Sequence, residues 1–234
     1  MQLLISVIDA GEAAAAMAGG TDILDIKNPA EGALGAPSPC TVREIRRAAP
    51  RPQPISVALG DMPDLPGTAA LAALGAAACG ADFVKLGLWG ARTEGAAVKL
   101  LSEVRVGLAA YPGVAVIAAA YADAGRVNAL DPACLARVAC AAGVAGCLLD
   151  TAVKDGCTLF DFMGDAGLAA LIRQAHVAGL LFALAGALRA EDLPRVRDLG
   201  ADIVGVRSAA CRDGRRSGPL EAERVARLRQ LAGR

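Results

Sequence analysis

Lysines are scarce in this 234-residue chain, and most of them lie where apolar stretches end. Of the 24 basic residues only four are lysines, and the others are arginines. Lys27 ends the stretch DILDIK, Lys85 lies within DFVKLGL, and Lys154 follows Asp150 by four residues. Only Lys99, in the helix-like stretch EGAAVKLLSEV, has the setting of an ordinary surface lysine. The other three lysines are therefore candidates for chemistry.

Clustered lysines can act as nucleophiles toward carbonyl compounds. A lysine attacks a carbonyl as the neutral amine, and a neighbouring cation in a dry pocket disfavours its charged form. Asp25 and Asp150 accompany the three lysines and could carry protons through carbinolamine and imine steps. These residue types favour imine chemistry that needs neither a metal ion nor a cofactor.

The elements that must position these residues follow from eight short apolar runs, each followed by a stretch with helical periodicity. We predict strands over Leu3–Ile8, Ile23–Lys27, Ile55–Leu59, Phe83–Gly87, Val114–Ala119, Gly146–Asp150, Leu181–Ala185 and Ile203–Val206. We predict helices near residues 11–18, 41–48, 68–78, 93–110, 132–141, 165–178, 190–198 and 219–232. Eight β-α units in a chain of this length predict an α/β fold, a single (β/α)8 TIM barrel spanning residues 1–234. An open doubly wound sheet is the alternative, but no GxGxxG follows any strand.

Alternation along the strands indicates which side chains enter the barrel. Asp25 and Lys27 share one face of their strand with Ile23, while the intervening apolar residues face the helices. Similar alternation directs Lys85 inward, and Asp150 ends the sixth strand. The lysines thus belong to the second, fourth and sixth strands, and alternate strands of such a barrel contribute to the same interior layer. We expect these charged residues to converge at the C-terminal mouth.

A phosphate site is expected on the loops after strands seven and eight, over residues 185–192 and 205–218. Their small residues let backbone N–H groups approach an anion, and Gly186 and Arg207 are the preferred contacts. Arg207 could instead belong to a structural ion pair. Two loops rich in proline and glycine, residues 28–40 and 61–67, follow strands two and three and could also border the active site.

Composition excludes several other classes of protein. Because 24 basic and 24 acidic residues balance, no general field attracts nucleic acid. No apolar run is long enough for a membrane span, and the N-terminus lacks the basic start of a secretory signal, so we expect a cytoplasmic protein with no membrane partner. The seven cysteines have no disulfide or zinc spacing, and His176 lies in a helical pattern. Ala-rich helices make a homo-oligomer possible.

Three segments together resemble a known enzyme family. They are Asp25-Ile-Lys27-Asn-Pro, Phe83-Val-Lys85-Leu-Gly and Leu149-Asp150-Thr-Ala-Val-Lys154-Asp-Gly. They resemble the (5-formylfuran-3-yl)methyl phosphate synthases, the furan-forming enzymes of methanofuran biosynthesis, and the similarity runs over the whole chain. The resemblance implies a lyase that condenses two molecules of glyceraldehyde 3-phosphate, with loss of phosphate and water, for a one-carbon carrier. It also implies Lys27 as the Schiff-base lysine and Lys85 as general acid/base, with Asp25, Asp150 and Lys154 completing the site.

Two alternatives stay open from the residues alone. Asp-x-Lys after strand two also resembles the orotidine-phosphate decarboxylase group, so another aldolase or a metal-independent decarboxylase acting on a sugar phosphate is possible. That group continues with an aspartate three residues beyond the lysine, where this chain has Ala30. A non-catalytic phosphate-binding barrel is the second alternative.

Overall fold

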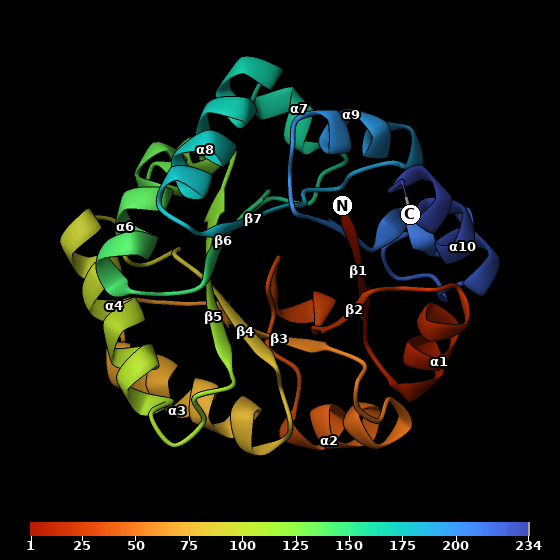
Figure 1. Cartoon of the computed structure of the whole chain (residues 1–234), viewed down its shortest axis with the longest axis horizontal. Coiled ribbons are helices and arrows are strands. Elements are labelled where there is room, and N and C mark those ends of the chain that lie inside the picture. Colours follow the sequence, from red (N-terminus) through yellow and green to blue (C-terminus); the bar gives the residue numbers. More distant parts are fainter. Residues whose placement is uncertain (234) are drawn as a thin grey trace.

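The computed structural model, which describes residues 1–233, confirms the predicted barrel. Eight parallel strands pair in chain order, and β8 closes the barrel onto β1 (Figure 1). The strands are β1 Gln2–Val7, β2 Ile23–Ile26, β3 Ile55–Asp61, β4 Phe83–Gly87, β5 Ala115–Tyr121, β6 Gly146–Asp150, β7 Leu181–Leu184 and β8 Ile203–Val206. Closure rules out the open doubly wound sheet.

One principal helix follows each strand, so the helices form a ring outside the strands (Figure 1). These helices are α1 Ala10–Ala18, α2 Pro39–Ala48, α3 Pro66–Ala78, α4 Glu94–Gly107, α6 Leu135–Ala142, α8 Asp165–Val177, α9 Leu193–Asp198 and α10 Ala222–Leu231. Side-chain caps begin several of them: Asp9 accepts a hydrogen bond from the backbone N–H of Glu12, and Thr93 accepts one from Ala96. The predicted helices are present, but several are shorter than the sequence pattern indicated.

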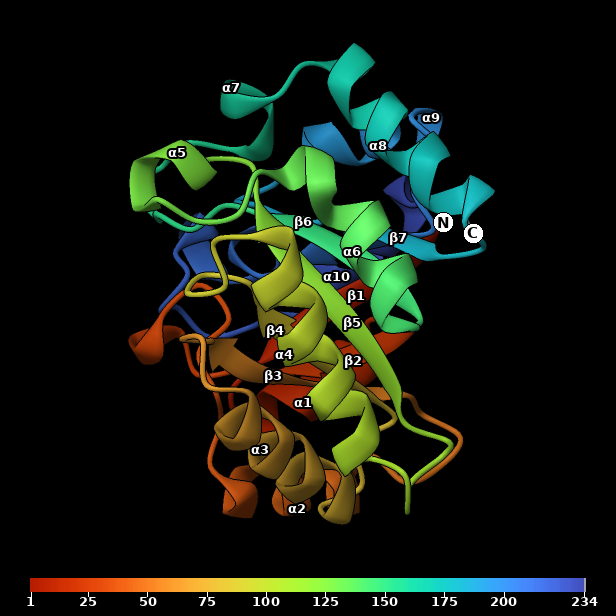
Figure 2. The ribbon, with the colours of Figure 1, turned by 90° about the vertical axis from the view of Figure 1, so that its left-hand side faces the viewer.

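The strands and loops differ from the prediction mainly at the C-terminal end of the barrel. β3 continues to Asp61 because that residue pairs with Gly87, and β5 continues to Tyr121 because Tyr121 pairs with Asp150. Two short helices were not predicted, α5 Ala124–Val127 and α7 Leu159–Phe162, which lie in neighbouring loops (Figure 2). The additional 3-10 turns are η1 Pro29–Glu31, η2 Pro132–Cys134, η3 Ala190–Asp192, η4 Ser208–Ala210 and η5 Arg212–Gly214.

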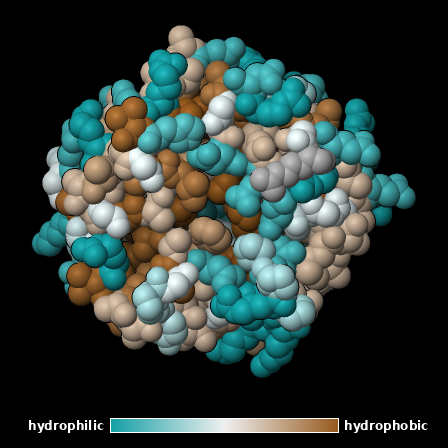
Figure 3. Space-filling model, in the orientation of Figure 1, coloured by the Kyte–Doolittle hydropathy of each residue, from teal (hydrophilic) through white to brown (hydrophobic). Residues whose placement is uncertain are grey.

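Two apolar clusters hold the barrel together, one inside it and one between strands and helices. Leu24 and Ile26 belong to the outer cluster, whereas Ile23 belongs to the inner one. This division confirms the predicted faces of β2, since alternate side chains point to opposite sides of a strand. Apolar residues also gather around the centre of the face seen in Figure 3. Charged and polar side chains inside the barrel are therefore exceptions to an apolar interior.

The loop after β2 folds down onto the barrel. Ala33 and Leu34 are almost completely buried and join the inner apolar cluster. The backbone N–H of Ala33 donates to Asp61 Oδ2 at 2.8 Å, and Asn28 N–H donates to the carbonyl oxygen of Gly35. These contacts fix the loop after β2 at the edge of the C-terminal opening of the barrel.

The histidine and the cysteines form no cluster with the lysines of the barrel mouth in the pairs that the structure describes, and one ion pair accounts for the histidine. His176 lies on α8 with its Nε2 atom 2.9 Å from Asp202 Oδ2, and all seven cysteines are free. Among residues 1–233 no helix combines the length and the apolar character needed to cross a membrane.

Candidate active site

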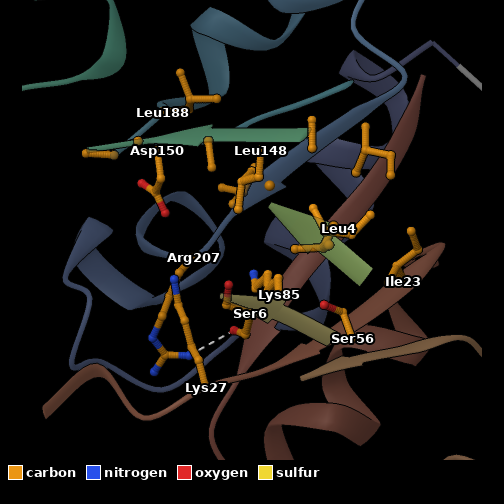
Figure 4. Close-up of a pocket in the computed structure, with 18 of the residues that line it drawn as sticks. Leu4, Ser6, Ile23, Lys27, Ser56, Lys85, Leu148, Asp150, Leu188 and Arg207 are labelled. Atoms are coloured by element: carbon orange, nitrogen blue, oxygen red, sulfur yellow. Dashed lines mark hydrogen bonds between the residues drawn. The ribbon is translucent and has the colours of Figure 1, made fainter. Parts of the chain in front are cut away.

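A cavity opens inside the barrel at the C-terminal ends of the strands. About 180 Å³ of it is available to solvent, far more than the ~10–15 Å³ that one water molecule needs. Its polar lining residues include Ser6, Lys27, Ser56, Lys85, Asp150 and Arg207 (Figure 4), together with Lys154, Ser208 and Arg216, and most of its other lining residues are apolar. The three lysines predicted from the sequence therefore line one cavity.

Lys85 and Asp25 form a buried ion pair between β4 and β2. The Lys85 Nζ atom lies 2.7 Å from Asp25 Oδ1, and the two side chains are 6% and 0% exposed. Ser6 of β1 donates its hydroxyl to Asp25 Oδ2 at 2.8 Å. Because both charges lie away from water, their mutual contact is what makes their burial tolerable.

Asp150 and Lys154 form a second ion pair. The Lys154 Nζ atom lies 2.7 Å from Asp150 Oδ1 and 3.0 Å from Thr151 Oγ1. Burial opposes ionisation of Asp150, but the cations of Lys154 and Lys27 and the backbone N–H of Thr151 together lower its pKa to about 2. Asp150 is thus a carboxylate at neutral pH.

A neighbouring carboxylate holds the loop that carries Lys154. Asp123, which is buried after the end of β5, accepts hydrogen bonds from the backbone N–H groups of Ala152 at 2.6 Å and Val153 at 3.0 Å. Hydrogen bonds to a charged acceptor are stronger than those between neutral groups. Asp123 therefore fixes the turn between Asp150 and Lys154.

Lys27 differs from the other two lysines because it has no ion-pair partner. Within residues 1–233, no carboxylate oxygen lies within salt-bridge distance of its Nζ atom, although the side chain is only 8% exposed. Burial, together with the charges of Lys85 and Lys154, lowers the pKa of Lys27 from 10.5 to about 7, and the charges of Asp150 and Asp25 limit this shift. A substantial fraction of this amine is neutral at physiological pH.

Arg207 forms the ion pair that the sequence left as its alternative role. Its Nη1 and Nη2 atoms donate to the two carboxylate oxygens of Glu12 at 2.8 and 3.2 Å. Nη1 also donates to the carbonyl oxygen of Ser6 (Figure 4), and Nε donates to that of Arg216. Every nitrogen of this guanidinium therefore already has a protein acceptor, and Arg207 ties α1, β1 and the β8–α10 loop together.

Unpaired backbone N–H groups lie on the cavity wall after β7 and β8. Within residues 1–233, the N–H groups of Gly186, Ala187, Leu188 and Ser208 donate to no protein acceptor. All four residues line the cavity. Gly186 has φ +110°, and a Cβ there would lie 3.1 Å from Thr151 Cγ2, so a larger residue would be strained and crowded. Free backbone amides on a cavity wall favour an anion.

Sequence reasoning missed several residues on the cavity wall or next to it. Tyr121 donates a very short hydrogen bond to Asp61, and burial followed by the Asp61 charge raises the pKa of Tyr121 well above its usual value. Asp123 and Arg216 were also missed. Tyr121 directly follows the apolar run VAVIAAA, and Asp123 comes two residues later, so the end of this strand could have indicated both. Nothing in the local sequence distinguishes Arg216 from its arginine neighbours.

Comparison with known proteins identifies the family. Residues 3–229 match the family model described as 4-HFC-P synthase. The chain belongs to this family. A relative from Methanocaldococcus jannaschii, named (5-formylfuran-3-yl)methyl phosphate synthase, is 46% identical, with 99% of each chain covered. A relative of the same name from Methanopyrus kandleri is 45% identical, with 97% of each chain covered. The predicted family and the prediction of an enzyme are confirmed.

Solved structures of lower identity share the barrel of this 4-HFC-P synthase family member. A 3-hexulose-6-phosphate synthase from Salmonella typhimurium superimposes with a TM-score of 0.69 at 17% identity, covering 99% of this chain and 98% of that one. A phosphoribosyl anthranilate isomerase from Thermus thermophilus superimposes with a TM-score of 0.62 at 16% identity, covering 99% of this chain and 98% of that one. These likenesses confirm the fold class.

Proposed function

We propose that the chain condenses two molecules of glyceraldehyde 3-phosphate into (5-formylfuran-3-yl)methyl phosphate, with loss of one phosphate and water, in methanofuran-type carrier biosynthesis. Lys27 is the nucleophile that forms a Schiff base with the first triose. The observation that carries this assignment is the contrast among the lysines: Lys85 and Lys154 each contact a carboxylate, whereas Lys27 is buried and unpaired. A neutral amine beside fixed charges is what carbonyl attack requires.

The two ion pairs supply the proton transfers. Lys85 lies on the wall as an ammonium held by Asp25, so it can donate a proton to a carbinolamine oxygen and recover it later. Asp150 stays ionised and can stabilise the cationic imine and the protonated amines around it, with Lys154 holding it in place. We assign no chemistry to Arg207, whose contacts suit a positioning role.

The phosphate of the first triose binds the free amides on the loop after β7 and at Ser208. Gly186, which the sequence analysis predicted as a phosphate contact, contributes one of these amides, and Ala187 and Leu188 contribute the next two. Backbone N–H groups bind phosphate without an added side-chain charge. This placement leaves the amine of Lys27 free for the carbonyl carbon.

Formation of a furan aldehyde tests the activity directly. When the purified protein is mixed with glyceraldehyde 3-phosphate, we expect a new ultraviolet absorption band, because the furan ring conjugated with its aldehyde absorbs where the triose does not. Product mass should match the furan phosphate, and inorganic phosphate should appear in equal amount. A protein that binds the triose phosphate without any new band or phosphate release would contradict the proposal and support the non-catalytic barrel.

The pH dependence of adduct formation tests the state of Lys27. Because the neutral amine attacks, and the pKa of Lys27 is about 7, adduct formation should rise roughly tenfold per pH unit below that value and level off above it. Trapping with cyanoborohydride and non-phosphorylated glyceraldehyde, followed by peptide mass spectrometry, measures this rate without titration of a substrate phosphate. A rate that keeps rising to pH 10 would show an ordinary lysine.

A further inference from the structure

Arg216 presents a charge at the cavity that no carboxylate neutralises directly. It lies in the loop between β8 and α10, on the cavity wall, and its side chain is partly buried. Within the described part of the chain, no carboxylate lies within salt-bridge distance of Arg216. The other guanidinium on this wall, that of Arg207, is neutralised by Glu12. Arg216 is therefore available to an anion.

The hydrogen bonds of Arg216 leave two of its nitrogens free. Nη2 donates to the carbonyl oxygen of Gly32 at 2.7 Å and, more weakly, to that of Ala33 at 3.5 Å. Nε and Nη1 donate to no acceptor within residues 1–233. An arginine stays protonated in proteins, although burial lowers the pKa of Arg216 and the Asp150 charge raises it. The free N–H bonds thus carry a full positive charge.

Two contacts hold Arg216 in place, one at its backbone and one at its guanidinium. Arg207 Nε donates to the backbone carbonyl oxygen of Arg216 at 2.8 Å, which fixes the loop. Gly32, which accepts from the guanidinium, precedes Ala33, whose N–H is bound by Asp61. The guanidinium is consequently held against the loop that follows Lys27. A preorganised donor loses less freedom when a ligand binds.

We propose that Arg216 binds the phosphate of the second triose, the one that adds to the Lys27 adduct. This inference rests on the proposed function, in which two phosphates must enter one cavity. Three of the four free amides, those of Gly186, Ala187 and Leu188, follow β7. Arg216 shares the loop after β8 with Ser208, but its guanidinium is anchored to the loop after β2, and β8 and β1 separate β7 from β2 in the barrel. Two phosphates repel each other, so separate sites on the wall suit two substrates.

Two steps measured on the same variants test this assignment. The first is the glyceraldehyde 3-phosphate concentration that gives half-maximal borohydride trapping on Lys27, and the second is the concentration that gives half-maximal furan formation. For Arg216→Gln we expect the half-maximal concentration for trapping to be unchanged. The half-maximal concentration for furan formation should rise about tenfold or more, since a charge-assisted hydrogen bond to phosphate is lost. Arg216→Lys should lie between, because it keeps the charge.

Arg215→Gln is the matched control, since its side chain is exposed and adjacent in sequence. It should leave both concentrations unchanged. Trapping by non-phosphorylated glyceraldehyde should be equal in all variants, which shows that the loop and Lys27 are intact. The inference would be overturned if Arg216→Gln left the half-maximal concentration for furan formation unchanged. It would also be overturned if the half-maximal concentration for trapping rose by the same factor. Failure of the proposed function is distinct, since the unsubstituted protein would then give no Lys27 adduct and no furan.

Discussion

Lys27→Met abolishes furan formation, with an expected loss of about 10³-fold or more in kcat, because no other group in the cavity is an unpaired amine. Methionine fills a similar volume without adding charge to the buried site. Lys27→Arg should be equally inactive, since a guanidinium does not form an imine. The measurement is furan absorbance together with borohydride trapping, which should give no adduct on either variant.

Lys99→Arg is the control for this experiment. Lys99 lies exposed on α4, so its substitution should leave activity unchanged. Circular dichroism and melting temperature should show that Lys27→Met keeps its fold, because removal of an unpaired buried amine leaves no partner uncompensated. Turnover near the original rate in Lys27→Met would move the nucleophile elsewhere, and the site of trapping in that variant would identify it.

Asp25→Asn should lower the free energy of unfolding by about 3–5 kcal/mol as well as the activity, because it leaves the ammonium of Lys85 buried without its partner. The hydroxyl of Ser6 would retain a hydrogen-bonding acceptor on the introduced asparagine only in one amide orientation. Urea unfolding followed by circular dichroism measures the change in stability. The large effect follows from burial, since Asp25 is completely inaccessible to solvent.

Two comparisons separate the ion pair from a general effect of substitution. The double variant Asp25→Asn with Lys85→Met should recover much of the stability but no activity, because it removes the uncompensated charge together with the proton donor. Glu94→Gln breaks the exposed pair with Arg137 and should change the stability little, because solvent screens that pair. If Asp25→Asn were no more destabilising than Glu94→Gln, the Lys85–Asp25 contact would not be the buried ion pair described above.

The barrel could be predicted because each strand carries its own local signal. Runs such as VAVIAAA are apolar on both faces, as strands between helices and a packed interior must be, and eight such runs specify the order of elements. The ends of β3 and β5 could not be predicted in this way. Asp61 and Tyr121 extend their strands by pairing with Gly87 and Asp150, which are distant in sequence.

The sequence predicted the position of a candidate residue best where a polar side chain occupies an inward-facing position of an apolar strand. Lys27, Lys85 and Asp150 each follow from a polar residue at an inward position near the end of a strand. Arg207 shows the limit of this reasoning. Its position on the cavity wall was predicted, but its bond to Glu12 joins residues 195 positions apart, and only the closure of β8 onto β1 brings them together.

The sequence by itself therefore determined the set of candidate groups and their end of the barrel, because side-chain direction along a strand is a local property. Only the tertiary structure decided which lysine is free. Lys85 meets Asp25 and Lys154 meets Asp150, while Lys27 lies among these charges with no carboxylate in contact. Ion pairing depends on distances across the barrel of a few ångströms, and the spacing of residues along the chain does not encode them.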